Sequence, residues 1–115
     1  MKKPLSAFLI ALSLFFSATG AAVSAQKTIY MTVWRGCEEA CEAFKKYFVS
    51  KGLQVQVAVR DAKRDKKVLP QFVKEARELK ADLVVTWGTS VTRGMAGTLK
   101  DAGDPRFIND IPIVF

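Results

Sequence analysis

Cys37 and Cys41 carry the most reactive side chains of this chain, and three residues separate them. In an oxidising compartment two cysteines most simply pair as a disulfide, and this spacing brings them close enough, although fully helical geometry would strain the bond. The redox motif of thiol–disulfide oxidoreductases has two intervening residues, and here Glu38 and Glu39 disfavour the thiolate. We expect a structural disulfide or two inert thiols, and keep the oxidoreductase as an alternative.

Ser90 lies in a segment that approaches the elbow motif of hydrolases. Gly88 precedes it by two residues, but Thr92 stands where that motif has its second glycine. The chain contains no histidine, so a Ser-His-acid triad and histidine-based metal sites are both excluded. It also lacks a glycine-rich phosphate loop ending in Lys-Ser or Lys-Thr. We therefore expect no catalytic residue, no metal, no cofactor and no enzymatic activity.

Two tryptophans follow strand-like runs. Trp34 closes residues 27–34, and Trp87 comes just after the apolar run at 83–85. If these two runs are neighbouring parallel strands, their carboxyl ends meet at the rim of the sheet where α/β proteins bind small molecules. Two indoles there would form an apolar wall for a ring. The alternative is that each tryptophan only covers the top of the core.

Polar groups flank both tryptophans. Arg35, or backbone N–H groups near Thr89 and Ser90 at the start of a helix, would receive a carboxylate or hydroxyl oxygen of a ligand. The alternative for Ser90 is that it only caps its helix. The predicted ligand-binding residues are Trp34, Arg35, Gly36, Trp87, Gly88, Thr89 and Ser90.

Strand and helix periods alternate along the chain. Residues 27–34 are dense in β-branched and aromatic residues, as strands buried on both faces are. Apolar residues then recur at helical spacing up to about residue 51, and Gly52 is typical of a helix end. The expected elements are strands at 27–34, 53–59, 83–85 and 111–115, with helices at about 38–51, at about 68–79, and after a cap formed by Thr89 and Ser90, the last presenting Val91, Met95 and Leu99 on one face.

This alternation predicts an α/β fold, with a parallel sheet in the order 2-1-3-4 and helices on both faces, Rossmann-like or flavodoxin-like. Residues 53–59 alternate with glutamine, which places that strand toward a sheet edge. Phe115 closes an apolar strand that would need a covering helix. We therefore expect a fragment of a longer protein, the alternative being a terminal edge strand.

Residues 1–25 match a secretory signal peptide. Lys2 and Lys3 precede an apolar run at 5–16, and small residues end at Ala25. The run is shorter than the roughly 20 apolar residues of a spanning helix, so an uncleaved anchor is the minor alternative. Removing these residues from the 115-residue chain leaves 90 residues, enough for one small domain. We expect a soluble periplasmic protein.

The net charge of +7 does not predict nucleic-acid binding. Lysines and arginines alternate with acids at 63–67 and 74–80, as on a solvated surface. Single-strand binders interleave basic clusters with aromatic residues, and this chain has no such cluster. We expect no nucleic-acid partner.

Three phrases and the leader together resemble the substrate-binding proteins of ABC importers. The phrases run from Val33 to Cys41, from Ala81 to Thr89 and from Asp110 to Phe115. They are similar to the amino-terminal portion of the branch of type I periplasmic binding proteins that takes amino acids such as tryptophan and tyrosine, or sugars. The resemblance covers nearly all of residues 26–115.

That resemblance implies two α/β lobes closing on a small-molecule solute, with residues 26–115 supplying the first four strands of lobe one. It implies delivery to an ABC permease at the inner membrane, and it places the ligand loops at the seven residues predicted above. Because the second lobe is missing, residues 26–115 alone would bind weakly or not at all. The alternatives are a periplasmic thiol–disulfide oxidoreductase using Cys37 and Cys41, or the sensing domain of a receptor.

Overall fold

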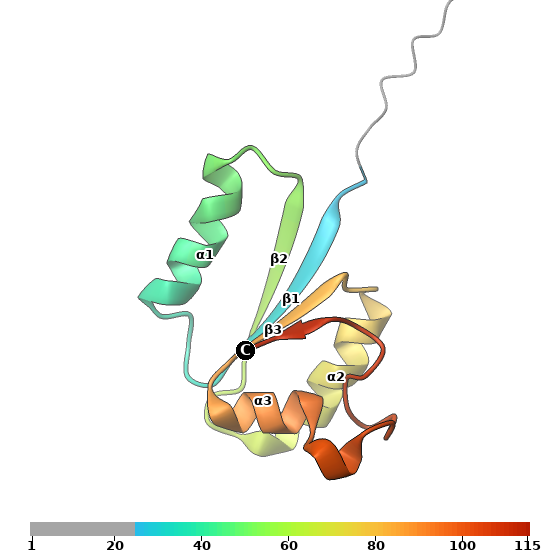
Figure 1. Ribbon diagram of the computed structural model, residues 1–115. Coiled ribbons are helices and arrows are strands. Elements are labelled where there is room, and N and C mark those ends of the chain that lie inside the picture. Colours follow the sequence, from blue (N-terminus) through green and yellow to red (C-terminus); the bar gives the residue numbers. More distant parts are fainter. Residues whose placement is uncertain (1–24) are drawn as a thin grey trace, which may run out of the picture.

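The computed structural model describes residues 25–115, and Figure 1 shows their arrangement. The predicted signal peptide lies outside the described residues, except for Ala25. The strands are β1 (Lys27–Val33), β2 (Val55–Asp61), β3 (Leu83–Trp87) and β4 (Ile113–Val114); the helices are α1 (Glu39–Ser50), α2 (Leu69–Glu78) and α3 (Thr89–Ala96), with 3-10 turns at Lys66–Val68 and Leu99–Asp101.

The four strands form one parallel sheet in the order β2-β1-β3-β4, which confirms the predicted α/β class and strand order. The fold is consistent with a Rossmann-like or flavodoxin-like half-lobe. β1 lies between β2 and β3, and Val33 at its end pairs with Asp61 on one side and with Trp87 on the other. The carboxyl ends of these three strands therefore meet at one rim of the sheet.

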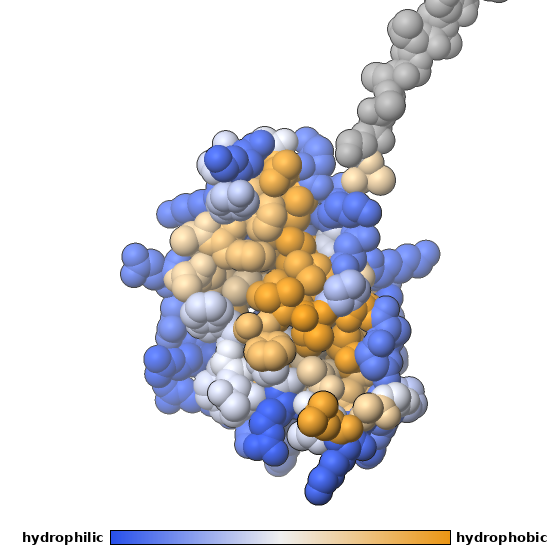
Figure 2. All heavy atoms as spheres, viewed as in Figure 1, coloured by the Kyte–Doolittle hydropathy of each residue, from blue (hydrophilic) through white to orange (hydrophobic). Residues whose placement is uncertain are grey.

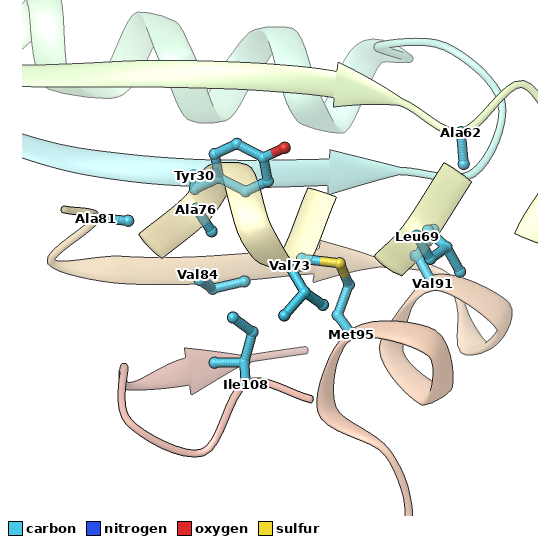
Figure 3. Close-up of a cluster of buried hydrophobic side chains, with 10 residues drawn as sticks. All are labelled: Tyr30, Ala62, Leu69, Val73, Ala76, Ala81, Val84, Val91, Met95 and Ile108. Atoms are coloured by element: carbon cyan, nitrogen blue, oxygen red, sulfur yellow. The ribbon is translucent and has the colours of Figure 1, made fainter. Parts of the chain in front are cut away.

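Helices cover both faces of the sheet, and each face has its own buried cluster. On one face α1 packs over Met31, Val33 and Val85 through the buried Cys41. On the other face α2 and α3 enclose a larger cluster with Tyr30 and Val84, and Figure 3 shows side chains from both helices and both strands pointing into it. Alternate residues of β1 thus serve opposite cores, which explains why five consecutive positions of this strand are buried.

The sheet face beside α1 is only partly covered. Val114 of β4 pairs with Val85 and is half exposed, and Phe115 next to it is 87% exposed. Figure 2 shows the resulting hydrophobic patch beside α1. Among residues 25–115, none of the helices combines the length and apolarity needed to cross a membrane.

The predicted end of α1 is confirmed, but β2 begins later than expected. Gly52 has φ +63°, and the N–H of Leu53 donates to the carbonyl of Phe48 at 3.0 Å. This hydrogen bond closes the helix in a left-handed turn, so Leu53 is committed to the helix end. The strand therefore starts at Val55 instead of residue 53 and continues to Asp61.

The predictions for α3 are wrong at both ends. The helix begins directly after Gly88, whose φ is +116°, and neither Thr89 nor Ser90 caps it, because both lie within its first turn. At its other end Gly97, with φ +73°, stops the helix, and Leu99 is 98% exposed instead of lying on the buried face. Val91 and Met95 are buried as predicted.

Candidate functional site

A pocket of about 210 Å³ opens at the carboxyl ends of β1 and β3. The residues after β1 supply one wall, and those at the end of β3 supply the other. It thus brings together the first five of the predicted ligand-binding residues and adds an acid that the sequence reasoning missed. Its lining residues are Trp34, Arg35, Gly36, Glu38, Trp87 and Gly88.

Strand register is the reason why the two tryptophan segments meet. Val33 and Trp87 are paired in the sheet, so the next residues along each strand, Trp34 and Gly88, face each other. A Cβ atom built on Gly88 would lie 3.3 Å from Cβ of Trp34, which is a tight contact. Gly88 also has φ +116°, a conformation that L side chains rarely adopt. The junction therefore depends on a glycine at this position.

The two indoles differ in burial. Trp34 is partly buried and packs against the cluster between the sheet and the pair α2 and α3, so it covers the core as well as lining the pocket. Trp87 is 49% exposed. An exposed indole at the mouth of a pocket leaves an aromatic surface on which a planar apolar group can stack. Of the two, Trp87 offers the larger contact surface.

Arg35 and Glu38 bring both signs of charge to the pocket. Nε of Arg35 donates a 2.8 Å hydrogen bond to Oε1 of Glu38, and both side chains are about half exposed. Each group keeps hydrogen-bonding capacity beyond this single bond. The pocket can therefore pair with an ammonium group and with a carboxylate of the same small molecule. Glu38 follows Arg35 by three residues, and that spacing was the signal available in the sequence.

The segment after β2 fastens the loop that carries Arg35. The carbonyl of Trp34 accepts a 2.8 Å hydrogen bond from the N–H of Arg64. The N–H of Lys63 donates a 2.8 Å hydrogen bond to the carboxylate of Asp61, and the N–H groups of Gly36 and Lys63 lower the pKa of that carboxyl. The ionised form of Asp61 at the end of β2 is therefore favoured beside the N–H of Gly36.

Thr89 and Ser90 do not line the pocket with Trp34. Thr89 borders a neighbouring pocket of about 530 Å³ together with Trp87 and Phe115. Ser90 borders a third pocket, of about 450 Å³, that lies between α2 and α3. The seven predicted residues thus fall into adjoining hollows along one rim, and a molecule in the 210 Å³ pocket would not touch Ser90.

A pair of threonines fixes the junction between β3 and α3. The hydroxyls of Thr86 and Thr92 lie 2.8 Å apart, and the Thr92 hydroxyl donates to the carbonyl of Gly88 at 3.0 Å. This carbonyl also receives the N–H of Thr92. These contacts hold Gly88 in place beside Trp34, and the sequence reasoning did not identify them.

Cys37 and Cys41 form a disulfide, so the two are not free thiols. Cys41 lies on the first turn of α1 and is 1% exposed. The bond itself does not distinguish a structural bridge from the resting state of a redox site. In the part of the chain from residue 25 onward, no group of three or more His, Cys, Asp or Glu side chains is placed to hold a metal ion.

Comparisons of the chain with protein families, with curated proteins and with solved structures gave no match. The pocket and its chemistry are therefore the features that bear on function.

Proposed function

We propose that the chain is the solute-binding component of an ABC-type importer, acting in the periplasm after its signal peptide is removed. It binds a small molecule at the rim formed by β1 and β3, performs no chemistry, and delivers the molecule to a permease at the inner membrane. Residues 26–115 then form the amino-terminal part of lobe one of a type I periplasmic binding protein. The pocket between Trp34 and Trp87 is the observation that carries this proposal.

The position of the pocket supports ligand binding. In open parallel sheets, small molecules bind outside the carboxyl ends of the strands where the strand order reverses. Here the chain passes from β1 outward to β2 and then back to β3 on the other side of β1, so the reversal falls between β1 and β3. The pocket lies at that point.

The lining of the pocket supports an amphiphilic solute. Trp87 offers an apolar face, while Arg35 and Glu38 offer one charge of each sign. An amino acid with an apolar side chain matches all three groups, because its carboxylate and ammonium can pair with Arg35 and Glu38. A sugar would use the same polar groups and stack its ring on the indole.

The size of the pocket supports a two-lobed protein. Sites that bury a small ligand usually enclose about 300–1,000 Å³, and this pocket has about 210 Å³ and is open to solvent. A second lobe closing over the rim would complete the enclosure and exclude water. We expect weak binding by the chain alone and tighter binding by the complete product of its gene.

Isothermal titration of the chain and of the complete gene product tests the proposal. The ligands are L-phenylalanine, L-tyrosine, L-tryptophan and a panel of hexoses and pentoses. We expect Trp87→Ala to weaken binding at least about tenfold, as loss of an aromatic anchor does. Leu99→Ala, which removes another exposed apolar side chain away from the pocket, is the control. Absence of heat with every ligand in the titrations of the complete gene product would refute the proposal.

Charge variants identify the ligand class. For an amino acid, Glu38→Gln should weaken binding, whereas Glu39→Gln, a neighbouring acid outside the pocket, should not. N-acetyl-L-phenylalanine amide lacks both charges and should bind poorly.

An insulin-reduction assay tests the alternative that the protein is an oxidoreductase. Turnover by the wild type that is lost in Cys37→Ser would favour this alternative. A spanning helix elsewhere in the complete gene product would favour a receptor.

A further inference from the structure

The disulfide lies next to the pocket and encloses one of its lining residues. Cys37 ends the loop that follows β1, and Cys41 stands on the first turn of α1 with the two Cα atoms 5.1 Å apart. The ring closed by this bond contains Glu38, the acid at the pocket rim. Arg35 and Gly36, which also line the pocket, directly precede the ring. Breaking the disulfide would therefore affect residues that line the pocket, because these lie within two residues of Cys37.

Glu38 depends on this ring more than its neighbours do. The N–H of Arg64 donates to the carbonyl of Trp34 at 2.8 Å, so the start of the loop is fastened to the segment after β2. Glu38 occupies the position before α1, but its side chain makes no capping hydrogen bond. Its carbonyl accepts the N–H of Glu42 at 3.0 Å, a hydrogen bond of the first helical turn, where helices fray most readily.

We propose that the Cys37–Cys41 disulfide is a redox gate of the solute pocket: the oxidised chain holds Glu38 at the rim, and reduction releases Glu38 and lowers ligand affinity. This inference rests on the proposed function for its effect on binding. The other part of the inference, that reduction releases the segment from Cys37 to Glu42, does not depend on which ligand binds.

The reductant is a dithiol, either a small molecule or an exported dithiol protein. Because Cys41 is 1% exposed and Cys37 is partly exposed, the dithiol thiolate attacks Sγ of Cys37. The S–S bond breaks, and Cys41 leaves as a thiolate that takes up a proton. The second thiol of the reductant then resolves the mixed disulfide, so Cys37 is released as a thiol. Two electrons and two protons reach the chain, and the reductant ends as its own disulfide.

Hydrogen–deuterium exchange of the full chain, oxidised and after treatment with dithiothreitol, tests the release. We expect the amides of Glu42 and Ala43, the first N–H groups of α1 that donate to carbonyls of the helical turn, to exchange on the order of tenfold faster after reduction, while those of β1 and β3 stay unchanged. Reoxidation should restore the slow exchange. The double variant Cys37→Ser, Cys41→Ser should exchange at the reduced rate under both conditions. Equal exchange in the two states of the wild type would overturn the gate, whatever the ligand results are.

Titration with L-phenylalanine under the same two conditions tests the effect on affinity. We expect reduction to raise Kd by about fivefold or more, the range of a typical coupling between two sites. The double serine variant should not respond to dithiothreitol. Faster exchange with an unchanged Kd would overturn the gating of binding. If the wild type binds neither this probe nor any other solute in either state, the proposed function fails, and exchange alone then decides whether the disulfide holds the segment.

Discussion

The hydroxyl of Tyr30 donates a 2.7 Å hydrogen bond to Oε2 of Glu75, joining the centre of β1 to α2. Tyr30 is fully buried, and burial together with the nearby Glu75 raises the pKa of its hydroxyl far above the usual value. Arg60 of β2 donates to the same carboxylate through Nε at 2.9 Å. The Glu75 carboxylate thus ties both β1 and β2 to α2.

Replacement of Tyr30 by phenylalanine should destabilise the fold. The substitution removes a hydrogen bond to a charged group, and we expect a loss of about 1–2 kcal/mol in the free energy of unfolding, measured in urea. Tyr47→Phe is the matched control, because Tyr47 is half exposed on α1. Equal stability of the Tyr30→Phe variant and the wild type would contradict a stabilising role for this bond.

Glu75 should make stability depend on acid. The hydrogen bond from Arg60 is the main cause that lowers the pKa of Glu75, and the bond from Tyr30 adds to it. The unfolded chain therefore takes up this proton first as pH falls. The stability from ionised Glu75 is complete above about pH 4.3, the value of an unfolded glutamate, and is lost as pH falls through the lower folded value.

Urea unfolding of Glu75→Gln across pH checks this dependence. The variant should be less stable than the wild type at neutral pH, and the difference should shrink below about pH 4. Glu78→Gln, on the same helix, is the control, since Glu78 is more exposed than Glu75 and forms a longer ion pair, with Lys74 at 3.8 Å. A difference that stays constant down to strong acid would rule out this role for Glu75.

Thr32 and Thr86 are paired across β1 and β3, and both are buried. Their hydroxyls differ in hydrogen bonding. Oγ1 of Thr86 bonds to Thr92, whereas Oγ1 of Thr32 has no hydrogen-bond partner among the described residues. A buried hydroxyl without a partner costs stability. Thr32→Val should therefore raise the free energy of unfolding by about 1 kcal/mol.

Thr86→Val provides the matched comparison for Thr32. It should lower stability, because it breaks the contact with Thr92 that helps to hold Gly88. Thermal unfolding of the two variants side by side gives the sign of each effect. Destabilisation by both substitutions to the same extent would show that the Thr32 hydroxyl has an undetected partner.

Gly88→Ala should damage both the fold and the pocket. The added methyl meets Trp34 at 3.3 Å in a backbone conformation that alanine rarely adopts, and we expect a cost of about 1–3 kcal/mol. Gly103→Ala is the control, because Gly103 also has a positive φ but nothing lies within 4 Å of the added Cβ. The loss at Gly88 should exceed the loss at Gly103, and the reverse order would show that contact with Trp34 has no cost.

The sheet and its order were predictable because the hydrophobic period switches cleanly between strands and helices. The strand order also predicted that Trp34 and Trp87 lie at one rim, because the carboxyl ends of neighbouring parallel strands meet at the same edge of the sheet. Element ends were less predictable. Leu53 has a strand-like neighbourhood in the sequence, yet its N–H closes α1, and this hydrogen bond involves a partner five residues away.

The errors at the site have local physical causes. Leu99 fits the helical period of Val91 and Met95, but Gly97 adopts a left-handed conformation that ends the helix first. Ser90 belongs to the predicted group of seven but lies inside the first turn of α3 and lines another hollow, between α2 and α3. Glu38 was missed because acids at a helix start are usually assigned to the helix dipole.

Trp34 and Trp87 are the only tryptophans of the chain, and their unequal burial divides the intrinsic fluorescence into two reporters. The emission of Trp34, which packs against the core, should move to longer wavelength when the chain unfolds. Trp87 already contacts water, so its emission should change little on unfolding and shift to shorter wavelength when a solute shields it. Single-tryptophan variants would thus separate loss of structure from occupancy of the pocket without any added dye.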